Sequence, residues 1–185
     1  MDIEQLLNTN YWFNYQNFYT DIANRKYKTL VEVGVWKGHS ISFLASKIKE
    51  LNYDAKIYAV DLFEEVIDEK WNKNLKEEIS VITKIYNKVL ENNDVRHMIT
   101  DIKGISWEMA NNFEDESVDF VFIDAGHEYD SVVKDITSWL PKIKKGGIIS
   151  GHDYFNPCGV KQAVDELITD VKFCSDGIIW YKEII

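Results

Sequence analysis

The chain has 185 residues, of which 45% are hydrophobic and 14% aromatic, and its net charge is −10. This length and apolar content suit one packed domain rather than a disordered chain. The acidic balance argues against a large nucleic-acid-binding face, which is basic, and against binding to an anionic membrane surface. No signal peptide or membrane-spanning apolar run is visible, and the two cysteines, Cys158 and Cys174, lack metal-site spacing. We therefore expect one domain over residues 1–185 in the cytoplasm, with neither nucleic acid nor membrane as a partner.

The predicted elements begin with an aromatic-rich helical segment over residues 1–28, which is expected to pack across a sheet edge, to cover a substrate pocket, or to do both. After it, short apolar runs typical of strands alternate with segments whose apolar residues recur every three or four positions, as on one helix face. The expected strands are residues 30–33, 56–60, 95–100, 118–123, 148–150, 171–174 and 178–181. The expected helices are residues 41–51, 62–93, 107–113, 132–140 and 160–168, with Gly146-Gly147 as a turn.

This alternation predicts an α/β fold, with a doubly wound and mostly parallel sheet of seven strands and an antiparallel last strand. Ligands bind such sheets at the carboxyl ends of the strands. We expect the polar residues at these ends to converge on one face: Glu32, Asp61, Asp101, Asp124, His152 and Asp153.

The stretch from Leu30 to Ser40 combines a buried strand with a glycine turn and a helix start. Gly34 lets the backbone turn sharply and lets a ligand approach closely. Ser40 is expected to begin the helix, whose first N–H groups are free to bind a ligand. Glu32, at the end of the strand, is suited to a positively charged group.

The order of these features resembles the class I S-adenosylmethionine-dependent methyltransferases, which have a Rossmann-like fold. More narrowly, it is similar to the small-molecule O-methyltransferases of the catechol type and the bacterial group that modifies sugars and antibiotics. The matching motifs are Glu32–Ser40, Asp61 at the end of the second strand, Asp119–Tyr129 and Gly146–Asp153. The resemblance extends from Leu30 to the end of the chain.

The resemblance implies S-adenosylmethionine as the cofactor. Glu32 would receive its ammonium group and Asp61 its ribose hydroxyls. Asp101 or Ser106 would bond the exocyclic amine of its adenine, while Trp107 either covers the ring or packs in the core. The residues expected to bind the cofactor are Glu32, Gly34, Val35, Trp36, Gly38, Ser40, Asp61, Leu62, Asp101, Ser106 and Asp124.

The resemblance also implies a reaction site formed by Asp124, His127, His152 and Asp153. Asp124, His152 and Asp153 would hold a divalent metal. Two carboxylates suit Mg²⁺, whereas the histidine favours Mn²⁺, Fe²⁺ or Zn²⁺. Alternatively, His152 hydrogen-bonds Asp124 and no metal is bound. His127, with an ordinary pKa near 6.5, would act as the general base, beside Asp124.

We therefore expect a methyltransferase that acts on a hydroxyl of a sugar, polyol or phenolic small molecule. Two alternatives stay open. An NAD-dependent oxidoreductase has the same kind of sheet, but Trp36 occupies the second glycine of its Gly-x-Gly-x-x-Gly motif. A non-catalytic binding protein could also keep this fold. The metal requirement and a homodimeric state are likewise left open.

Overall fold

The computed structural model describes residues 13–63, 73–155, 159–174 and 178–185. A sheet runs through these residues in the order β3-β2-β1-β4-β5-β7-β6. Only β7 runs against the other six strands, so the predicted doubly wound sheet with an antiparallel last strand is confirmed. The strands are β1 (Thr29–Val33), β2 (Lys56–Asp61), β3 (Ile99–Lys103), β4 (Val118–Ile123), β5 (Ile143–Gly151), β6 (Lys172–Phe173) and β7 (Trp180–Glu183).

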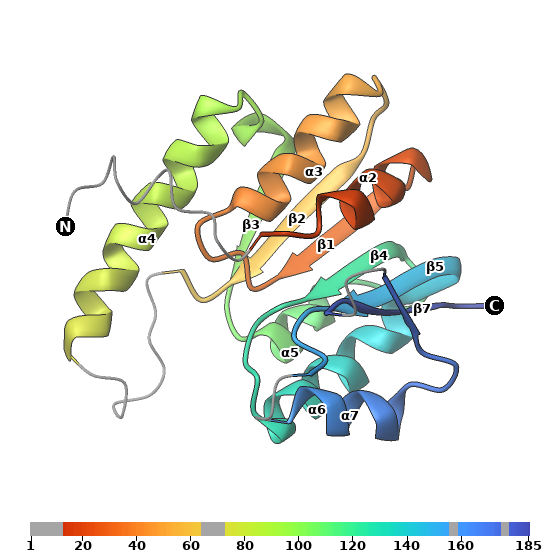
Figure 1. Cartoon of the computed structure of the whole chain (residues 1–185). Helices are drawn as coiled ribbons and strands as arrows, with labels where there is room; N and C mark the ends of the chain where they lie inside the picture. The colour runs from red at the N-terminus through yellow and green to blue at the C-terminus, as the bar shows by residue number, and fades with distance from the viewer. Residues whose placement is uncertain (1–12, 64–72, 156–158, 175–177) are drawn as a thin grey trace.

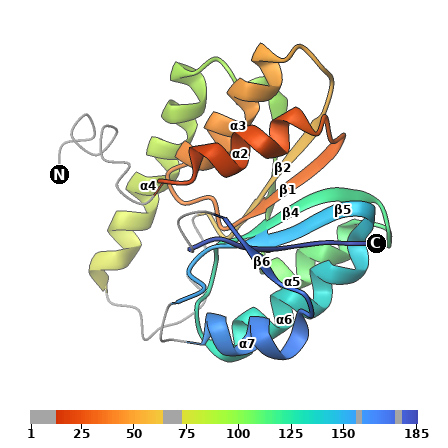
Figure 2. The same cartoon turned by 45° about the vertical axis from the view of Figure 1, so that its right-hand side comes forward.

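Helices cover both faces of the sheet, because successive strand residues point to opposite sides. Phe120 and Phe122 pack in one apolar cluster with α2, α3 and α4, whereas Val121 packs in the other with α6 and α7. Figures 1 and 2 show the resulting three layers. The helices are α2 (Gln16–Asn24), α3 (His39–Glu50), α4 (Lys73–Asn92), α5 (Ser106–Met109), α6 (Tyr129–Trp139) and α7 (Val160–Leu167), with 3₁₀ turns η1 (Arg96–Met98), η2 (Ala110–Asn112) and η3 (Leu140–Lys142).

The described part of the aromatic N-terminal segment, residues 13–28, packs on the face of the sheet and not across its edge. The rings of α2 contact β4 in the middle of the sheet: the Phe18 and Phe120 centroids are 6.1 Å apart, and those of Tyr19 and Phe122 are 5.2 Å apart. Residues 1–12 of this segment lie outside the described part of the chain.

Two strand predictions are corrected by the structure. Residues 96–98 form the turn η1, so β3 begins at Ile99 and not at Val95. β5 begins at Ile143 and not at Ile148, because Gly146 and Gly147 form an irregularity within the strand instead of a turn.

The order of the strands reverses between β1 and β4, which are neighbours in the sheet. At such a reversal the loops after the two strands separate, and a ligand can enter between them. β5 pairs with β4 in parallel, so the loops after β1, β4 and β5 all lie at the same edge. Within the described residues, no helix is long and apolar enough to cross a bilayer.

Candidate active site

Two glycines in left-handed backbone conformations shape the loop between β1 and α3. Gly34 has φ +81°, and its N–H donates to the Val60 carbonyl at 2.9 Å. A Cβ added to Gly34 would lie 2.1 Å from the carbonyl oxygen of Asp124, so only glycine fits. Gly38 has φ +77°, and a Cβ there would lie 2.6 Å from the Tyr86 ring. The backbone of this loop therefore lies directly against the end of β4.

Asp61 organises the loops around it through its carboxylate. Its Oδ2 accepts the N–H groups of Val35 at 2.8 Å and Trp36 at 3.4 Å, and its Oδ1 accepts that of Phe63 at 3.0 Å. Its backbone carbonyl accepts the Gly104 N–H at 3.0 Å, which joins the loop after β3 to the end of β2. Asp61 thus lies where the loops after β1, β2 and β3 meet.

The loop residues beside Asp61 differ in exposure. The Val35 side chain is buried, Leu62 is half-buried, and Trp36 is 48% exposed. The backbone of Trp36 is in the left-handed region, with φ +46°. Val35 can offer a ligand mainly its backbone, whereas Trp36 presents an aromatic ring to solvent.

Glu32 is a buried carboxyl group that links α2 to the glycine loop. Tyr19 of α2 donates its hydroxyl to Glu32 Oε2 at 2.7 Å, and Ser40 donates to Oε1. Burial raises the pKa of Glu32 to about 8, although both hydrogen bonds oppose the rise. The prediction that Ser40 caps α3 is wrong: the helix begins at His39 after Gly38, and the Ser40 hydroxyl is used by Glu32.

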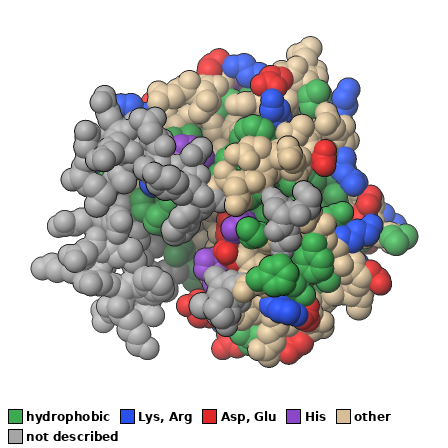
Figure 3. Space-filling view, in the orientation of Figure 1, with side chains coloured by type: hydrophobic (Ala, Val, Ile, Leu, Met, Phe, Trp, Pro, Cys, Tyr) green, Lys and Arg blue, Asp and Glu red, His purple; other side chains and the backbone are tan. Residues whose placement is uncertain are grey.

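Four side chains meet where β4 and β5 end. Asp153 Oδ2 lies 3.0 Å from His127 Nε2 and 3.1 Å from His152 Nδ1. Asp124 Oδ1 lies farther off, 3.8 Å from His127 Nε2 and 3.9 Å from His152 Nδ1. The face in Figure 3 has histidine and acidic side chains adjacent to one another, bordered by hydrophobic ones. The structure therefore brings together Asp124, His127, His152 and Asp153, and His152 lies closer to Asp153 than to Asp124.

Tyr15 also belongs to this region, although the sequence analysis assigned it no role. Its ring is 5.2 Å from that of His152 and 5.0 Å from that of Phe122. Burial raises the pKa of the Tyr15 hydroxyl, and the carboxylates of Asp124 and Glu32 raise it further. The available signal was the aromatic density of residues 1–28, which does not say which ring reaches the site.

Of the two residues predicted to contact adenine, Asp101 has both carboxylate oxygens engaged. Oδ1 accepts the Tyr86 hydroxyl at 2.6 Å, and Oδ2 forms an ion pair with Arg96. Asp101 lies inside β3, so its predicted position at a strand end is wrong. Ser106, the first residue of α5, is half-buried and accepts the indole N–H of Trp139 at 3.0 Å.

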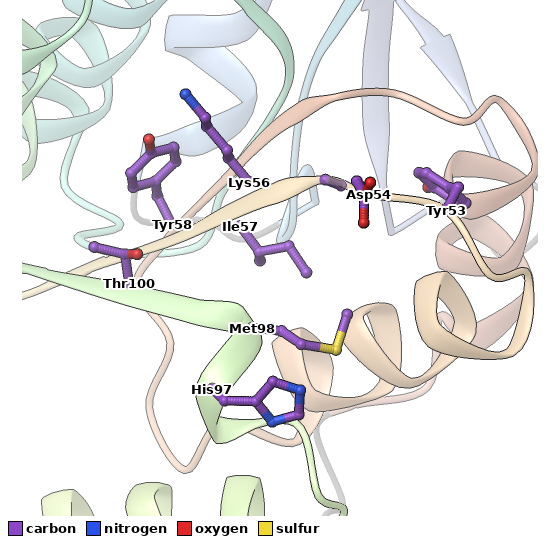
Figure 4. A pocket seen from close by; sticks show the side chains of 9 residues that line it. Tyr53, Asp54, Lys56, Ile57, Tyr58, His97, Met98 and Thr100 are labelled. Carbon is purple, nitrogen blue, oxygen red and sulfur yellow. The ribbon is translucent and has the colours of Figure 1, made fainter.

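A groove lies at the amino ends of β2 and β3, away from Asp61 and the four-residue cluster. It has a volume of about 520 Å³ and is lined by Tyr53, Ile57, Met98 and other residues of these strand starts. Figure 4 shows the Met98 and Ile57 side chains directed toward each other across it. Because ligands of such sheets bind at the carboxyl ends, this groove is separate from the candidate site.

The electrostatics of the four-residue cluster can be tested by titration. The carboxylates of Asp124 and Asp153 raise the pKa of His127 from an ordinary 6.5 to about 10. The pKa of His127 is higher in the folded protein than in the unfolded chain. The ion pairs of protonated His127 therefore contribute fully to the free energy of unfolding below pH 6.5, and this contribution is lost as the pH rises through 10. Removing one charge with Asp153→Asn should lower the pKa of His127 toward 6.5, measured by NMR of the imidazole protons. An unchanged pKa would contradict this pairing.

Comparison with known proteins identifies the family and the fold. A family model described as a methyltransferase domain matches residues 31–154. The fold is similar to that of the O-methyltransferase NovP, with a TM-score of 0.70 and 19% identity, covering 92% of this chain and 78% of that one. It is also similar to an O-methyltransferase from Bacillus cereus in complex with SAH, with a TM-score of 0.65 and 14% identity. This match covers 97% of this chain and 87% of the Bacillus cereus chain.

A third similar structure is the O-methyltransferase TomG from Streptomyces achromogenes in complex with SAM. Its TM-score is 0.63 at 14% identity, and the match covers 92% of this chain and 79% of TomG. A search of curated protein sequences finds no match. At these identities the structural neighbours show the fold, and the family model, which spans more than half of the chain, shows the family. The chain belongs to the methyltransferase-domain family and has its Rossmann-like fold.

Proposed function

We propose that the protein transfers the methyl group of S-adenosylmethionine to a hydroxyl of a small molecule, such as a sugar, polyol or phenol. The observation that carries the proposal is the meeting of Asp124, His127, His152 and Asp153 beside the glycine loop of β1. Methyl transfer requires little covalent chemistry from the protein, which has to position the two reactants and remove the hydroxyl proton.

The loops at the carboxyl edge of the sheet suit the parts of this cofactor. The backbone of the glycine loop after β1 would receive the methionine part. Asp61 keeps one acceptor position, on Oδ1, for a ribose hydroxyl, because each carboxylate oxygen can accept two bonds and backbone N–H groups occupy the other three positions. SAM and SAH are named in the bound structures of TomG and the Bacillus cereus enzyme, which supports the same cofactor here. Glu32 is 2% exposed and accepts one hydroxyl at each carboxylate oxygen, so one lone pair on each oxygen would remain for the cofactor's ammonium.

The donor atoms of Asp124, His152 and Asp153 fit a divalent metal. One ligand atom from each lies within 4.8 Å of the other two, and the Nε2 of His152 is buried without a hydrogen-bond partner among the described residues. A mixed nitrogen and oxygen set suits Mn²⁺, Fe²⁺ or Zn²⁺ better than Mg²⁺, which prefers oxygen. A bound ion of this kind lowers the pKa of a hydroxyl that coordinates it.

The role of His127 as general base depends on the charge around it. With a pKa of about 10, its ring holds a proton at neutral pH and cannot accept another. The expectation of an ordinary pKa near 6.5 was wrong because the carboxylates of Asp124 and Asp153 stabilise the imidazolium. A cation held near these carboxylates, whether a metal or a sulfonium, would oppose this effect and lower the pKa of His127, so that its ring could accept a proton.

Metal binding is testable without any acceptor. Calorimetric titration of the protein with Mn²⁺ should give one site, and Asp153→Asn should weaken it because a carboxylate ligand is lost. Asp115→Asn is a matched control, since that carboxylate pairs with Lys142 on the surface. Equal Mn²⁺ affinity in the wild type and Asp153→Asn would exclude this residue as a ligand.

Cofactor binding should depend on Asp61. Asp61→Ala should weaken binding of S-adenosylhomocysteine by about 1.5–3 kcal/mol, the range for hydrogen bonds to a charged group, as measured by calorimetry. Asp119→Ala is the control: Asp119 Oδ2 likewise accepts a backbone N–H, that of Thr29 at 2.8 Å, but at the amino end of the sheet. If both variants lose affinity equally, the effect comes from folding and not from ribose binding.

A thermal-shift comparison separates the proposed function from its alternatives. A ligand that binds the folded state at 100 times its Kd stabilises it by about 2.7 kcal/mol and raises the melting temperature. S-adenosylmethionine and S-adenosylhomocysteine should do so, and NAD should not. Stabilisation by NAD alone would favour an oxidoreductase. Binding of S-adenosylmethionine without transfer to any sugar, polyol or phenol would favour a non-catalytic binding protein.

A further inference from the structure

The four-residue cluster lies on two connections of the chain, one from β4 to α6 and one from β5 to α7. Asp124 and His127 belong to the first, and His152 and Asp153 begin the second. The N–H of His152 donates to the carbonyl of Ile123 at 3.1 Å, where the parallel pairing of β4 and β5 ends. This bond fixes His152 and Asp153 relative to the end of β4. His127 lies farther along its connection and needs a second support.

The second support is a backbone bridge between the two connections. Glu128, which follows His127 directly and precedes α6, pairs with Gly159 in an antiparallel bridge. Gly159 in turn immediately precedes α7, and Figures 1 and 2 show α6 and α7 side by side. The bridge therefore fixes the backbone next to His127, whose Nε2 lies 3.0 Å from Asp153 Oδ2.

The backbone at Gly159 leaves no room for a side chain. Gly159 has φ +135°, and a Cβ added to it would lie 2.5 Å from the backbone nitrogen of Tyr129 and 2.7 Å from its Cα. Ordinary contacts of a Cβ begin near 3.4 Å, so the two backbones would have to separate by about 1 Å. Tyr129 is the first residue of α6, and its hydroxyl donates to Glu166, which ties the start of this helix to α7. The bridge thus requires glycine.

We propose that Gly159 is a positioning residue: through its bridge to the start of α6 it holds the His127 ring against Asp153 for methyl transfer. The hydrogen bond of Tyr129 to Glu166 supports the same bridge. This inference rests on the proposed function, in which the His127 ring removes the proton of the acceptor. Gly159 has no side chain with which to touch a substrate, so it acts through His127. Misplacing a catalytic group by about 1 Å, the shift that an added Cβ demands, costs about 10²-fold in rate.

The first test compares the crystal structures and rates of two alanine variants, Gly159→Ala and Gly146→Ala. In Gly159→Ala the distance from His127 Nε2 to Asp153 Oδ2 should lengthen by about 1 Å, and kcat should fall by about 10²-fold. The rate is measured as S-adenosylhomocysteine formed with any sugar, polyol or phenol that the wild type methylates. Gly146 also has a positive φ, but a Cβ there meets no atom within 4 Å, so Gly146→Ala should keep the wild-type distance and kcat.

A double-mutant cycle separates positioning from a general structural effect. If Gly159 acts through His127, Gly159→Ala should lower kcat no further once His127 is replaced by alanine. If the bridge only stabilises the fold, the losses in kcat from the two substitutions should multiply, which would overturn the inference.

Tyr129→Phe serves if Gly159→Ala does not fold, because it removes only the hydroxyl that donates to Glu166. It should lower kcat by about 2- to 10-fold, the value of one hydrogen bond, and should have no effect in the His127→Ala background. A wild-type kcat in Tyr129→Phe would then overturn the inference.

Failure of the proposed function gives a different result. If the wild type methylates no hydroxyl, the proposed function fails, and the crystal structure of Gly159→Ala or Tyr129→Phe still decides whether the bridge positions His127. An active wild type with an unchanged distance and kcat in Gly159→Ala overturns the inference alone.

Discussion

Replacing Gly34 with alanine is expected to destabilise the protein by about 2–5 kcal/mol, the sum of overpacking and left-handed backbone strain, and to abolish cofactor binding. The added Cβ would lie 2.1 Å from the Asp124 carbonyl oxygen and 2.9 Å from the Ala125 Cα, which are backbone atoms that cannot move aside independently. The loop after β1 and the end of β4 would have to separate. The free energy of unfolding in urea and the calorimetric affinity for S-adenosylhomocysteine measure the two effects.

Gly146→Ala is the matched control for this substitution. Gly146 has φ +80°, nearly the value of Gly34, but a Cβ there meets no atom within 4 Å. Its cost should be the backbone strain alone, about 1–2 kcal/mol, with unchanged cofactor affinity. If the two variants lose the same stability, contact between the loop and β4 does not explain the need for glycine at Gly34.

Substituting His127 with alanine is expected to slow methyl transfer by about 10²–10⁴-fold, the usual loss for a general base. The ring lies 3.0 Å from Asp153, in the cluster that we propose removes the proton of the acceptor hydroxyl. The rate should be measured as S-adenosylhomocysteine formed with any sugar, polyol or phenol that the wild type methylates. The wild-type rate should rise with pH through the pKa of His127, and this rise should be missing in the variant.

His97→Ala provides the comparison, because this histidine lines the groove at the opposite end of the sheet. It should retain wild-type rate and pH dependence. A His127→Ala enzyme with full activity and an unaltered pH profile would mean that the cluster is structural. A chelator that abolishes wild-type activity reversibly, while His127→Ala stays active, would assign proton removal to the metal alone.

The local pattern of apolar residues was sufficient to predict the strands at the centre of the sheet. Residues 118–123 were predicted as a strand and form β4, because an uninterrupted apolar run suits a strand that is buried on both faces. The topology followed from the alternation of strands and helices, and with it the expectation that Asp124 and Asp153 would end neighbouring strands. That expectation is confirmed by the parallel pairing of β4 with β5.

Pattern was insufficient where a residue's role depends on a distant contact. Gly146-Gly147 reads as a turn in isolation, but the pairing of β5 with β4 continues on both sides of it. Asp101 reads as a strand-end acid, yet the turn η1 shifts β3 and its carboxylate meets Arg96. Ser40 reads as a helix cap, but a buried carboxylate on β1 takes its hydroxyl.

His127 was added to the site by the resemblance to known methyltransferases. Otherwise the sequence by itself determined the fold class and the edge of the sheet at which Asp124, His152 and Asp153 lie. These depend on periodicity and chain order, which are local properties of the sequence. The tertiary structure alone decided that Tyr15 and Tyr19, from α2 and the residue before it, reach the site, and that His127 lies between two carboxylates. Each of these joins segments far apart in the chain, and both the pKa of a group and the direction of a hydroxyl proton depend on such neighbours.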